Sequence, residues 1–388
     1  MAAGQCKLLV LRKRRFSGIL FQRLRNRLEH LRHTRKMPRL CASMEMDDLS
    51  SVSAGFAARK LVFENRSTMN FAEIIDNLLV RGNDFDVLQE TVSEFHTLLS
   101  NLANISEETG DKALNQPIIT PEGKAISPTD AARCVLDIAR TTKFTHGIFA
   151  AIKKAQIDFQ GEKIKILYAG CGPFAALALP HCTRFGPDEI EFTVIDVHQR
   201  SLDSARKIAG KLGFEDHFAE FISADAAVYK SEDKFHIIVT ETMQKTLEKE
   251  PQVAITRNLA GNLRENGTFI PQKITVKAHL ASLAMEFSAS DPSIMQKARI
   301  PLGTLLELTV NSDDIRAPQV ITIPPGEIES KDLILTTELE IFDGILLGDY
   351  ESGITYPTVL HNILPKENMK IEFKYESGEV PGFVWKVV

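Results

Sequence analysis

The sequence between residues 163 and 207 constrains the fold more than any other part of this chain. An apolar stretch, 164–169, leads into the turn Gly170-Cys171-Gly172-Pro173, and a second apolar stretch ends at Asp196. A glycine turn between a strand and a helix lets a ligand approach bare backbone, and the helix N-terminus offers free N–H groups. An acid at the end of the next strand is placed to accept hydrogen bonds from ribose hydroxyls. The pattern therefore predicts a site for a nucleotide-like cofactor.

Strand-like and helix-like patterns alternate through residues 163–270, which is typical of a parallel sheet with crossover helices. The predicted strands are 164–169, 191–196, 218–223 and 235–240, and a helix is predicted over 201–212. Beyond Pro271 apolar and polar residues alternate with a period of two, which indicates antiparallel strands. We therefore predict an α/β chain with a Rossmann-like parallel-sheet domain over 126–270, preceded by helices, and an antiparallel β domain over 271–388.

Helical patterns precede the first strand of the predicted parallel sheet. Within the region 46–125, which we predict to be helical, apolar residues recur at helical spacing from Phe71 until Gly82 ends the pattern. A second helix carries Leu88, Val92, Phe95 and Leu99 on one face. Ser127-Pro128-Thr129-Asp130 is typical of a helix start, and we expect that helix to lead on through Val135, Leu136 and Ile138.

The charge is distributed unevenly along the chain. The net charge is −5, yet residues 1–40 hold 12 Lys and Arg against one acid, Glu29, so the remainder is strongly acidic. We predict that residues 1–45 form a disordered basic extension. The alternatives are an organelle-targeting segment and a basic arm for nucleic acid or anionic lipid. An acidic body is a poor platform for nucleic acid, so we do not expect a nucleic-acid partner.

The cysteines and the hydropathy of the sequence limit the kinds of protein that this chain could be. The five cysteines show no Cys-x-x-Cys spacing, so neither a disulfide framework nor a metal site is predicted, and a cytoplasmic location is expected. The longest nearly apolar run, 166–180, is shorter than a membrane span and is interrupted by Gly and Pro, so no membrane association is expected.

The choice of cofactor depends on the context of the glycine turn. Gly170-x-Gly172-x-x-Ala175 is also an accepted variant for dinucleotides, and a glycine turn that holds no ligand is a further alternative. Helices precede the first strand, however, and acids end successive strands at Asp196 and Asp225. Together with the Gly-Cys-Gly-Pro turn itself, these features favour S-adenosylmethionine over NAD. Asp225 is also suited to capping a helix.

The turn resembles the first motif of class I S-adenosylmethionine-dependent methyltransferases, and further segments resemble the protein arginine methyltransferase family. The segment 137–144 is similar to the family's Asp-x-x-Arg-Thr-x-x-aromatic helix, and Thr240-Glu241-Thr242-Met243 followed by Glu250 is similar to its double-glutamate loop. Leu263 to Pro271 resembles the passage into the family's β-barrel. The resemblance covers roughly residues 125–388.

The resemblance implies a role for each matching residue. Arg140 would clamp the methionyl carboxylate of S-adenosylmethionine, and Asp196 would hold the ribose hydroxyls. Gly170, Cys171 and Gly172 would form the cofactor turn, and Asp225 would lie near the adenine. Glu241 and Glu250 would grip the target guanidinium. The family's dimeric state implies a homodimer.

Two departures from the family pattern bear on the acceptor. Tyr168 stands where class I methyltransferases usually carry an acid, and the family's Thr-His-Trp triplet is absent. Its counterpart, Tyr356 to His361, has Val359 and Leu360 where His and Trp would stand. We therefore expect a methyltransferase that N-methylates a cationic or guanidino-type acceptor, either protein arginine or a smaller molecule. An NAD-dependent oxidoreductase and a non-catalytic binding protein of the same fold are the alternatives.

Overall fold

The computed structural model describes residues 69–80, 84–105, 112–288, 296, 298–312, 315, 317–326, 328 and 331–388. Its internal contacts separate residues 1–68 from residues 69–388, and the second unit contains all of the described residues. The predicted basic extension, 1–45, and the predicted helix stop at Gly82 lie outside the described residues.

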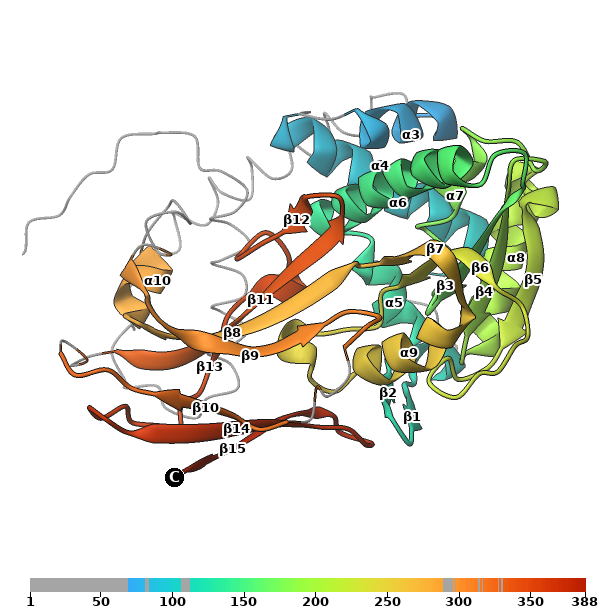
Figure 1. Cartoon of the computed structure of the whole chain (residues 1–388). Coiled ribbons are helices and arrows are strands. Elements are labelled where there is room, and N and C mark those ends of the chain that lie inside the picture. Colours follow the sequence, from blue (N-terminus) through green and yellow to red (C-terminus); the bar gives the residue numbers. More distant parts are fainter. Residues whose placement is uncertain are drawn as a thin grey trace, which may run out of the picture. The chain divides into compact units, whose positions relative to one another are not determined.

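Two helices open the described part of the chain (Figure 1). Helix α3 (Phe71–Leu79) begins with a capping box, in which Asn70 and Glu73 exchange side chain-to-backbone hydrogen bonds. Helix α4 (Phe85–Ala103) ends at Asn104, whose φ of 59° turns the backbone out of the helix. Both helices bury one apolar face, as their sequence spacing predicts.

A hairpin and two further helices lead into the sheet. The hairpin consists of β1 (Ile118–Thr120) and β2 (Gly123–Ala125), and the sequence did not indicate it. Helices α5 (Pro128–Cys134) and α6 (Ile138–Asp158) follow. The expectation of one helix leading through Ile138 is wrong, because Asp137 is extended and its carboxylate accepts a hydrogen bond from Arg140 N–H, so that it caps a second helix.

A five-stranded parallel sheet follows, in the order β5-β4-β3-β6-β7. Its strands are β3 (Ile164–Ala169), β4 (Ile190–Asp196), β5 (Phe218–Ser223), β6 (Phe235–Thr240) and β7 (Leu263–Ile270). The four predicted strands of this sheet are confirmed. From β3 the chain adds β4 and β5 on one side of the sheet. It then returns to the other side of β3, where it adds β6 and β7. In such sheets ligands bind at the point where the strand order reverses, which here lies between the ends of β3 and β6.

Helices cover both faces of the parallel sheet. Side chains of Ile164 and Ile166 share one apolar cluster with α6 and α8 (Gln199–Leu212), whereas Leu167 and Ala169 share the other with α9 (Gln252–Leu259). A short helix, α7 (Leu179–Cys182), lies between β3 and β4 in sequence. Because strands buried on both faces cannot alternate apolar and polar residues, the apolar runs in the sequence are those of a doubly covered sheet.

The last third of the chain is antiparallel, as predicted. One sheet contains β8 (Lys273–Ala281), β9 (Ile300–Leu308), β11 (Asp332–Phe342), β12 (Ile345–Leu347) and β13 (Thr358–Val359). The other contains β10 (Gln319–Thr322), β14 (Lys370–Glu376) and β15 (Gly382–Val387), and helix α10 (Leu283–Ser288) follows β8. Within the described residues no ladder joins the two sheets, so their hydrogen bonds do not close a barrel.

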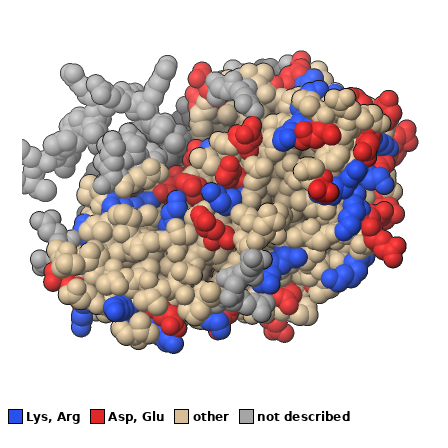
Figure 2. Space-filling view, viewed as in Figure 1, with Lys and Arg blue, Asp and Glu red and all other residues tan. Residues whose placement is uncertain are grey.

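The surface carries charges of both signs. Figure 2 shows Lys and Arg interspersed with Asp and Glu over the face that it presents, which has no broad basic area. Of the helices that the structure describes, none combines the length and apolar character needed to span a membrane.

Candidate functional site

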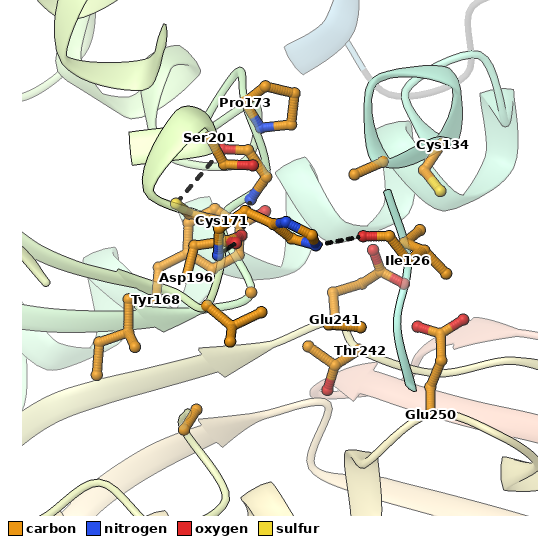
Figure 3. A pocket seen from close by; sticks show the side chains of 18 of the residues that line it. Ile126, Cys134, Tyr168, Cys171, Pro173, Asp196, Ser201, Glu241, Thr242 and Glu250 are labelled. Carbon is orange, nitrogen blue, oxygen red and sulfur yellow. Dashed lines mark hydrogen bonds between the residues drawn. The ribbon is translucent and has the colours of Figure 1, made fainter. Parts of the chain in front are cut away.

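A single cavity contains all of the site residues that the sequence predicts. It opens where β3, β4 and β6 end, and about 1040 Å³ of its interior holds no protein atom, part of that space being open to solvent. Its walls come from the turn after β3, the ends of β4 and β5, the segment after β6, helix α5 and the β1–β2 hairpin (Figure 3). The predicted residues that line it are Arg140, Gly170, Cys171, Gly172, Asp196, Asp225, Glu241 and Glu250.

The glycine turn is shaped by two different constraints. Both glycines have positive φ, 75° at Gly170 and 61° at Gly172, in a region that side chains disfavour. A Cβ on Gly170 would also lie less than 3.0 Å from Thr242 Cγ2, whereas one on Gly172 would lie 3.5 Å from Ala131 Cβ. Gly170 thus lets the turn pack against the segment after β6, and Gly172 leaves the cavity side of the turn without a side chain.

Asp196 fixes the turn from the end of β4. One carboxylate oxygen accepts a hydrogen bond from Gly172 N–H at 2.9 Å, and the other accepts one from His198 N–H at 2.8 Å. Burial raises the pKa of this carboxyl group, and the two N–H donors oppose that rise. Since each carboxylate oxygen can accept more than one hydrogen bond, Asp196 keeps acceptor capacity toward the cavity.

Asp225 and Tyr168 also line the cavity. The Asp225 side chain accepts a hydrogen bond from Ala227 N–H at 2.9 Å and so caps the turn after β5, where the alternative interpretation expected the start of a helix. Burial raises the pKa of Tyr168 well above its usual value, so this side chain is a neutral phenol where the family pattern has an acid.

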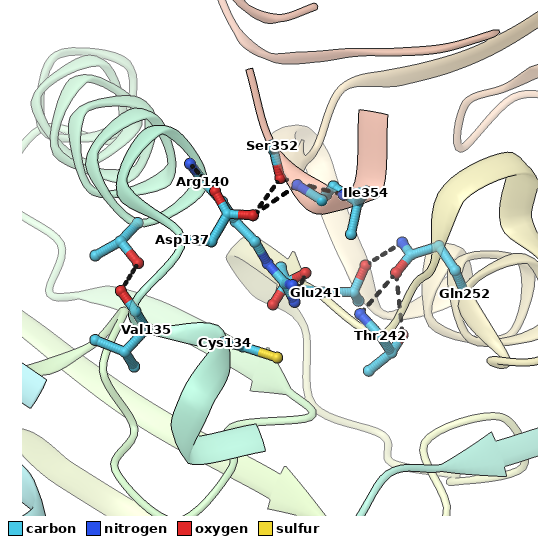
Figure 4. A network of polar contacts seen from close by, with 12 residues as sticks. Cys134, Val135, Asp137, Arg140, Glu241, Thr242, Gln252, Ser352 and Ile354 are labelled. Atoms are coloured by element: carbon cyan, nitrogen blue, oxygen red, sulfur yellow. Dashed lines mark hydrogen bonds and ion pairs between the residues drawn. The ribbon is translucent and has the colours of Figure 1, made fainter. Parts of the chain in front are cut away.

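Arg140 and Glu241 form a buried ion pair in the middle of the cavity wall (Figure 4). Arg140 comes from the first turn of α6 and Glu241 from the segment directly after β6. The helix turn that carries Arg140 is anchored by Asp137, whose second oxygen accepts hydrogen bonds from Ser352 Oγ at 2.7 Å and Gly353 N–H at 2.8 Å. The C-terminal part that contains the two antiparallel sheets, residues 273–388 (the β region), therefore helps to position Arg140, because it holds the start of α6.

The pKa values of both carboxyl groups in this wall are raised by burial. Burial, together with the nearby charge of Glu250, raises the pKa of Glu241 to about 7 in spite of Arg140. Burial also raises the pKa of Glu250, against the lowering effects of Arg140 and Lys124. The pKa of Arg140 is raised above its usual value, mainly by Glu241 and against the effect of its own burial. Glu241 is thus able to exchange a proton near neutral pH, next to a permanent cation.

Glu250 lies on a strained segment that the β sheets support. Thr246, Leu247 and Lys249 have φ values of 55°, 57° and 68°, which is costly for residues other than glycine. Three hydrogen bonds from the β region hold this segment: Thr337 Oγ1 accepts from Thr246 N–H at 2.8 Å, Pro381 O accepts from Lys249 N–H at 2.8 Å, and Tyr375 Oη donates to Leu247 O at 2.8 Å.

Gln252 fixes the other end of this wall. Its side-chain oxygen accepts hydrogen bonds from Thr242 N–H at 3.1 Å and Thr242 Oγ1 at 3.0 Å, and its amide nitrogen donates to Thr240 and Thr256. The side chain is completely buried. The sequence did not single out Gln252, because Thr240 and Thr242 lie at the end of β6 and their proximity to Gln252 depends on the fold.

The β1–β2 hairpin forms the opposite wall and was missed in the sequence. Lys124 N–H donates to Lys249 O at 2.7 Å, and His198 Nε2 lies 2.9 Å from Ile126 O, directly after the hairpin. The signal that was available is the turn-forming Pro121-Glu122-Gly123, with short runs of apolar residues on either side. His198 is buried in this contact.

Several other features stay outside the cavity. His181 is fully buried, and this burial lowers its pKa to about 3. The counterpart of the Thr-His-Trp triplet contributes Thr358 and Val359 to strand β13, and neither lines the cavity. Among the described residues no group of His, Cys, Asp or Glu side chains is arranged to hold a metal ion.

The chain was compared with known proteins by sequence and by structure. No protein-family model matches the sequence, and no curated protein matches it. Among solved structures, the chain is similar to one described as Trypanosoma brucei PRMT1 enzyme-prozyme heterotetrameric complex with AdoHcy. That match has 15% sequence identity and a TM-score of 0.46, and it covers 66% of this chain and 91% of the other.

Proposed function

We propose that this chain is an S-adenosylmethionine-dependent methyltransferase that acts on a nitrogen of a cationic acceptor. One observation carries the proposal. A single cavity at the switch point of the parallel sheet combines a glycine turn, the acceptor group of Asp196, the cation of Arg140 and the two buried carboxyl groups of Glu241 and Glu250. A dinucleotide site needs the first two features but gives no reason for the last three.

The lining of the cavity suits this cofactor. Gly172 leaves the cavity side of the turn without a side chain, and Ser201 Oγ is buried at the cavity wall without a hydrogen-bond partner among the described residues. Asp196 would accept hydrogen bonds from the ribose hydroxyls, and Asp225 would face the adenine amino group. Arg140 offers the planar donor set that matches a carboxylate, so it would hold the amino-acid end of the cofactor.

The chain's own residues would contribute orientation and charge to the reaction. The bound cofactor supplies an electrophilic methyl group on a sulfonium sulfur. Glu241 and Glu250 would neutralise the acceptor cation and point one nitrogen toward that methyl group. Because the pKa of Glu241 is raised to about 7, this carboxylate is able to take the proton that the acceptor nitrogen releases at neutral pH.

Ligand binding followed by turnover tests the proposal. We expect S-adenosylhomocysteine, and not NAD, to raise the melting temperature of the full chain, since a ligand that binds only the folded state stabilises it. Asp196→Ala should weaken S-adenosylhomocysteine binding, whereas Glu241→Gln should leave it nearly unchanged and reduce methyl transfer. Glu265→Gln, which changes an exposed carboxylate far from the cavity lining, is the matched control.

The alternatives give different results. Stabilisation by NAD alone would support an oxidoreductase and overturn the proposal. Tight binding of S-adenosylhomocysteine without transfer of a labelled methyl group to any acceptor would indicate a binding protein that has the fold but not the activity.

A further inference from the structure

The cavity has a cofactor end, at the glycine turn and Asp196, and an acceptor end, at Glu241 and Glu250. The walls of the acceptor end are the β1–β2 hairpin and the segment that carries Glu241 and Glu250. Among the described residues the cavity lining stops at Ile255, so neither antiparallel sheet contributes a side chain to it. Thr337, Pro381 and Tyr375, from residues 273–388, hold the Glu250 segment by hydrogen bonds on the side away from the cavity. The β1–β2 hairpin lines the cavity itself.

The hairpin lies directly against the Glu250 segment. A Cβ on Gly123 would lie 2.9 Å from Pro251 N and 3.1 Å from Lys249 O, so the two backbones touch there without room for a side chain. The hydrogen bond from Lys124 N–H to Lys249 O closes the same junction. A polypeptide chain cannot pass between two backbones at this separation, so this side of the cavity is closed to an extended substrate.

The closed wall carries a cation. Lys124 lines the cavity, as does Thr120 at the end of the other hairpin strand, and its charge acts on Glu250. Arg140 contacts Glu241 and is the residue proposed to hold the carboxylate of the cofactor, so it is not available to the acceptor. Lys124 makes no ion pair within 4.0 Å and no side-chain hydrogen bond to any residue that the structure describes, and its side chain is only partly exposed..

An ammonium group beside the carboxylates opposes the binding of a simple cation. Like charges within one cavity repel, so Lys124 would weaken the binding of a guanidinium or amine that carries no other charge. The same group would attract an acceptor that carries an anion on the side away from the reacting nitrogen. With Arg140 on the carboxylate of the cofactor, the acceptor end of the cavity presents the carboxyl groups of Glu241 and Glu250 and the cation of Lys124, a charge pattern complementary to a zwitterion.

We infer that the acceptor is a small zwitterion, with its cationic nitrogen at Glu241 and Glu250 and its carboxylate at Lys124. The inference rests on the proposed function and narrows the acceptor to a free amino acid, a guanidino acid or a compound of the same charge pattern. Lys124 is then a specificity-determining residue. An arginine side chain within a protein lacks the carboxylate that Lys124 would bind.

Matched pairs of acceptors test the inference with the full chain. Guanidinoacetate, L-arginine and L-ornithine are compared with methylguanidine, agmatine and putrescine, which lack only the carboxylate, and with a peptide that contains an internal arginine. We expect labelled methyl transfer to at least one carboxylate-bearing probe. Its kcat/KM should be at least roughly 10-fold above that of its decarboxylated partner, because the partner cannot form the charged hydrogen bond with Lys124. Equal or faster transfer to the partner or to the peptide, or no transfer to any carboxylate-bearing probe, overturns the inference.

A charge variant separates the role of Lys124 from general damage. Lys124→Gln should raise KM for the preferred probe roughly 10-fold with little change in kcat, and it should leave the Kd of S-adenosylhomocysteine unchanged. Lys112→Gln removes an exposed lysine close in sequence but outside the cavity lining and should have no effect. An unchanged KM in Lys124→Gln, or a weakened Kd for S-adenosylhomocysteine, contradicts the assignment.

The proposed function and the small-zwitterion inference are contradicted by different results. If wild-type protein does not bind S-adenosylhomocysteine, the proposed function itself is wrong. If it binds this ligand and methylates the arginine peptide in preference to the free zwitterions, the proposed function stands and the small-zwitterion inference is wrong.

Discussion

Replacing Gly170 by alanine tests whether two separate features require a glycine at this position, namely a positive φ and a close contact with Thr242. The φ of 75° at Gly170 should cost a side chain about 1–2 kcal/mol. The new Cβ would also lie less than 3.0 Å from Thr242 Cγ2. Overpacking of a buried site typically costs about 1–3 kcal/mol more, so we expect Gly170→Ala to lower the free energy of unfolding by about 2–5 kcal/mol.

Gly161 supplies the matched control for the conformational part. Its φ is 80°, and a Cβ there would meet no atom within 4 Å. Gly161→Ala should therefore lose only the conformational contribution, about 1–2 kcal/mol. The comparison is made by urea denaturation at equal slope, so that a shift in midpoint reports a change in stability.

A second substitution isolates the steric part. Thr242→Ser removes Cγ2 but keeps the hydroxyl that donates to Gln252 Oε1 at 3.0 Å. In the double variant Gly170→Ala/Thr242→Ser, the loss should therefore shrink to that of Gly161→Ala, and the double-mutant cycle gives the coupling energy. The reasoning is refuted if Gly170→Ala costs no more than Gly161→Ala, or if Thr242→Ser gives no recovery.

Three further predictions concern the wall that carries the carboxyl groups. The kcat/KM of methyl transfer should rise with pH and reach half its maximum near pH 7, because deprotonation of Glu241 creates the charge that holds the acceptor; a profile that is flat between pH 6 and 8 would contradict this. Tyr375→Phe should reduce kcat and cost about 1 kcal/mol in urea denaturation, with an unchanged Kd for S-adenosylhomocysteine, because it removes the hydrogen bond to Leu247 O behind Glu250. Asp137→Ala should cost about 1–2 kcal/mol through the lost helix cap and should weaken the same Kd by releasing Arg140; a loss of stability with unchanged Kd would show that Arg140 does not depend on this cap.

The sequence predicted the parallel sheet well because the relevant signals are local. Each strand from β3 to β6 is an apolar run bounded by turn residues, and the glycine turn and Asp196 stand at strand ends by their position alone. Once the strands are parallel and adjacent, the ends of β3, β4 and β6 must share one edge. That geometric necessity is why residues far apart in sequence were correctly expected to meet.

The rest of the site depends on contacts that a sequence does not record. Nothing local to Arg140 indicates that it pairs with Glu241, since the pairing needs α6 and β6 to lie side by side. The hairpin was missed because each of its strands has only three residues, too few to establish a period. The positive φ values of Thr246, Leu247 and Lys249 were equally invisible, because none of these residues favours that conformation.

These long-range contacts explain why a β region that lines no part of the cavity is still needed by it. A segment with three non-glycine residues at positive φ does not hold its shape alone, because each of them favours another conformation. Hydrogen bonds from Thr337, Pro381 and Tyr375 supply the missing constraint, and Ser352 does the same for Asp137 at the start of α6. The carboxyl group of Glu250 and the guanidinium of Arg140 are therefore positioned from one side by the parallel sheet and from the other by the antiparallel sheets. A chain that lost the β region would keep the glycine turn and Asp196, and with them the means to bind a nucleoside. It would lose the fixed arrangement of charges that the proposed methyl transfer requires.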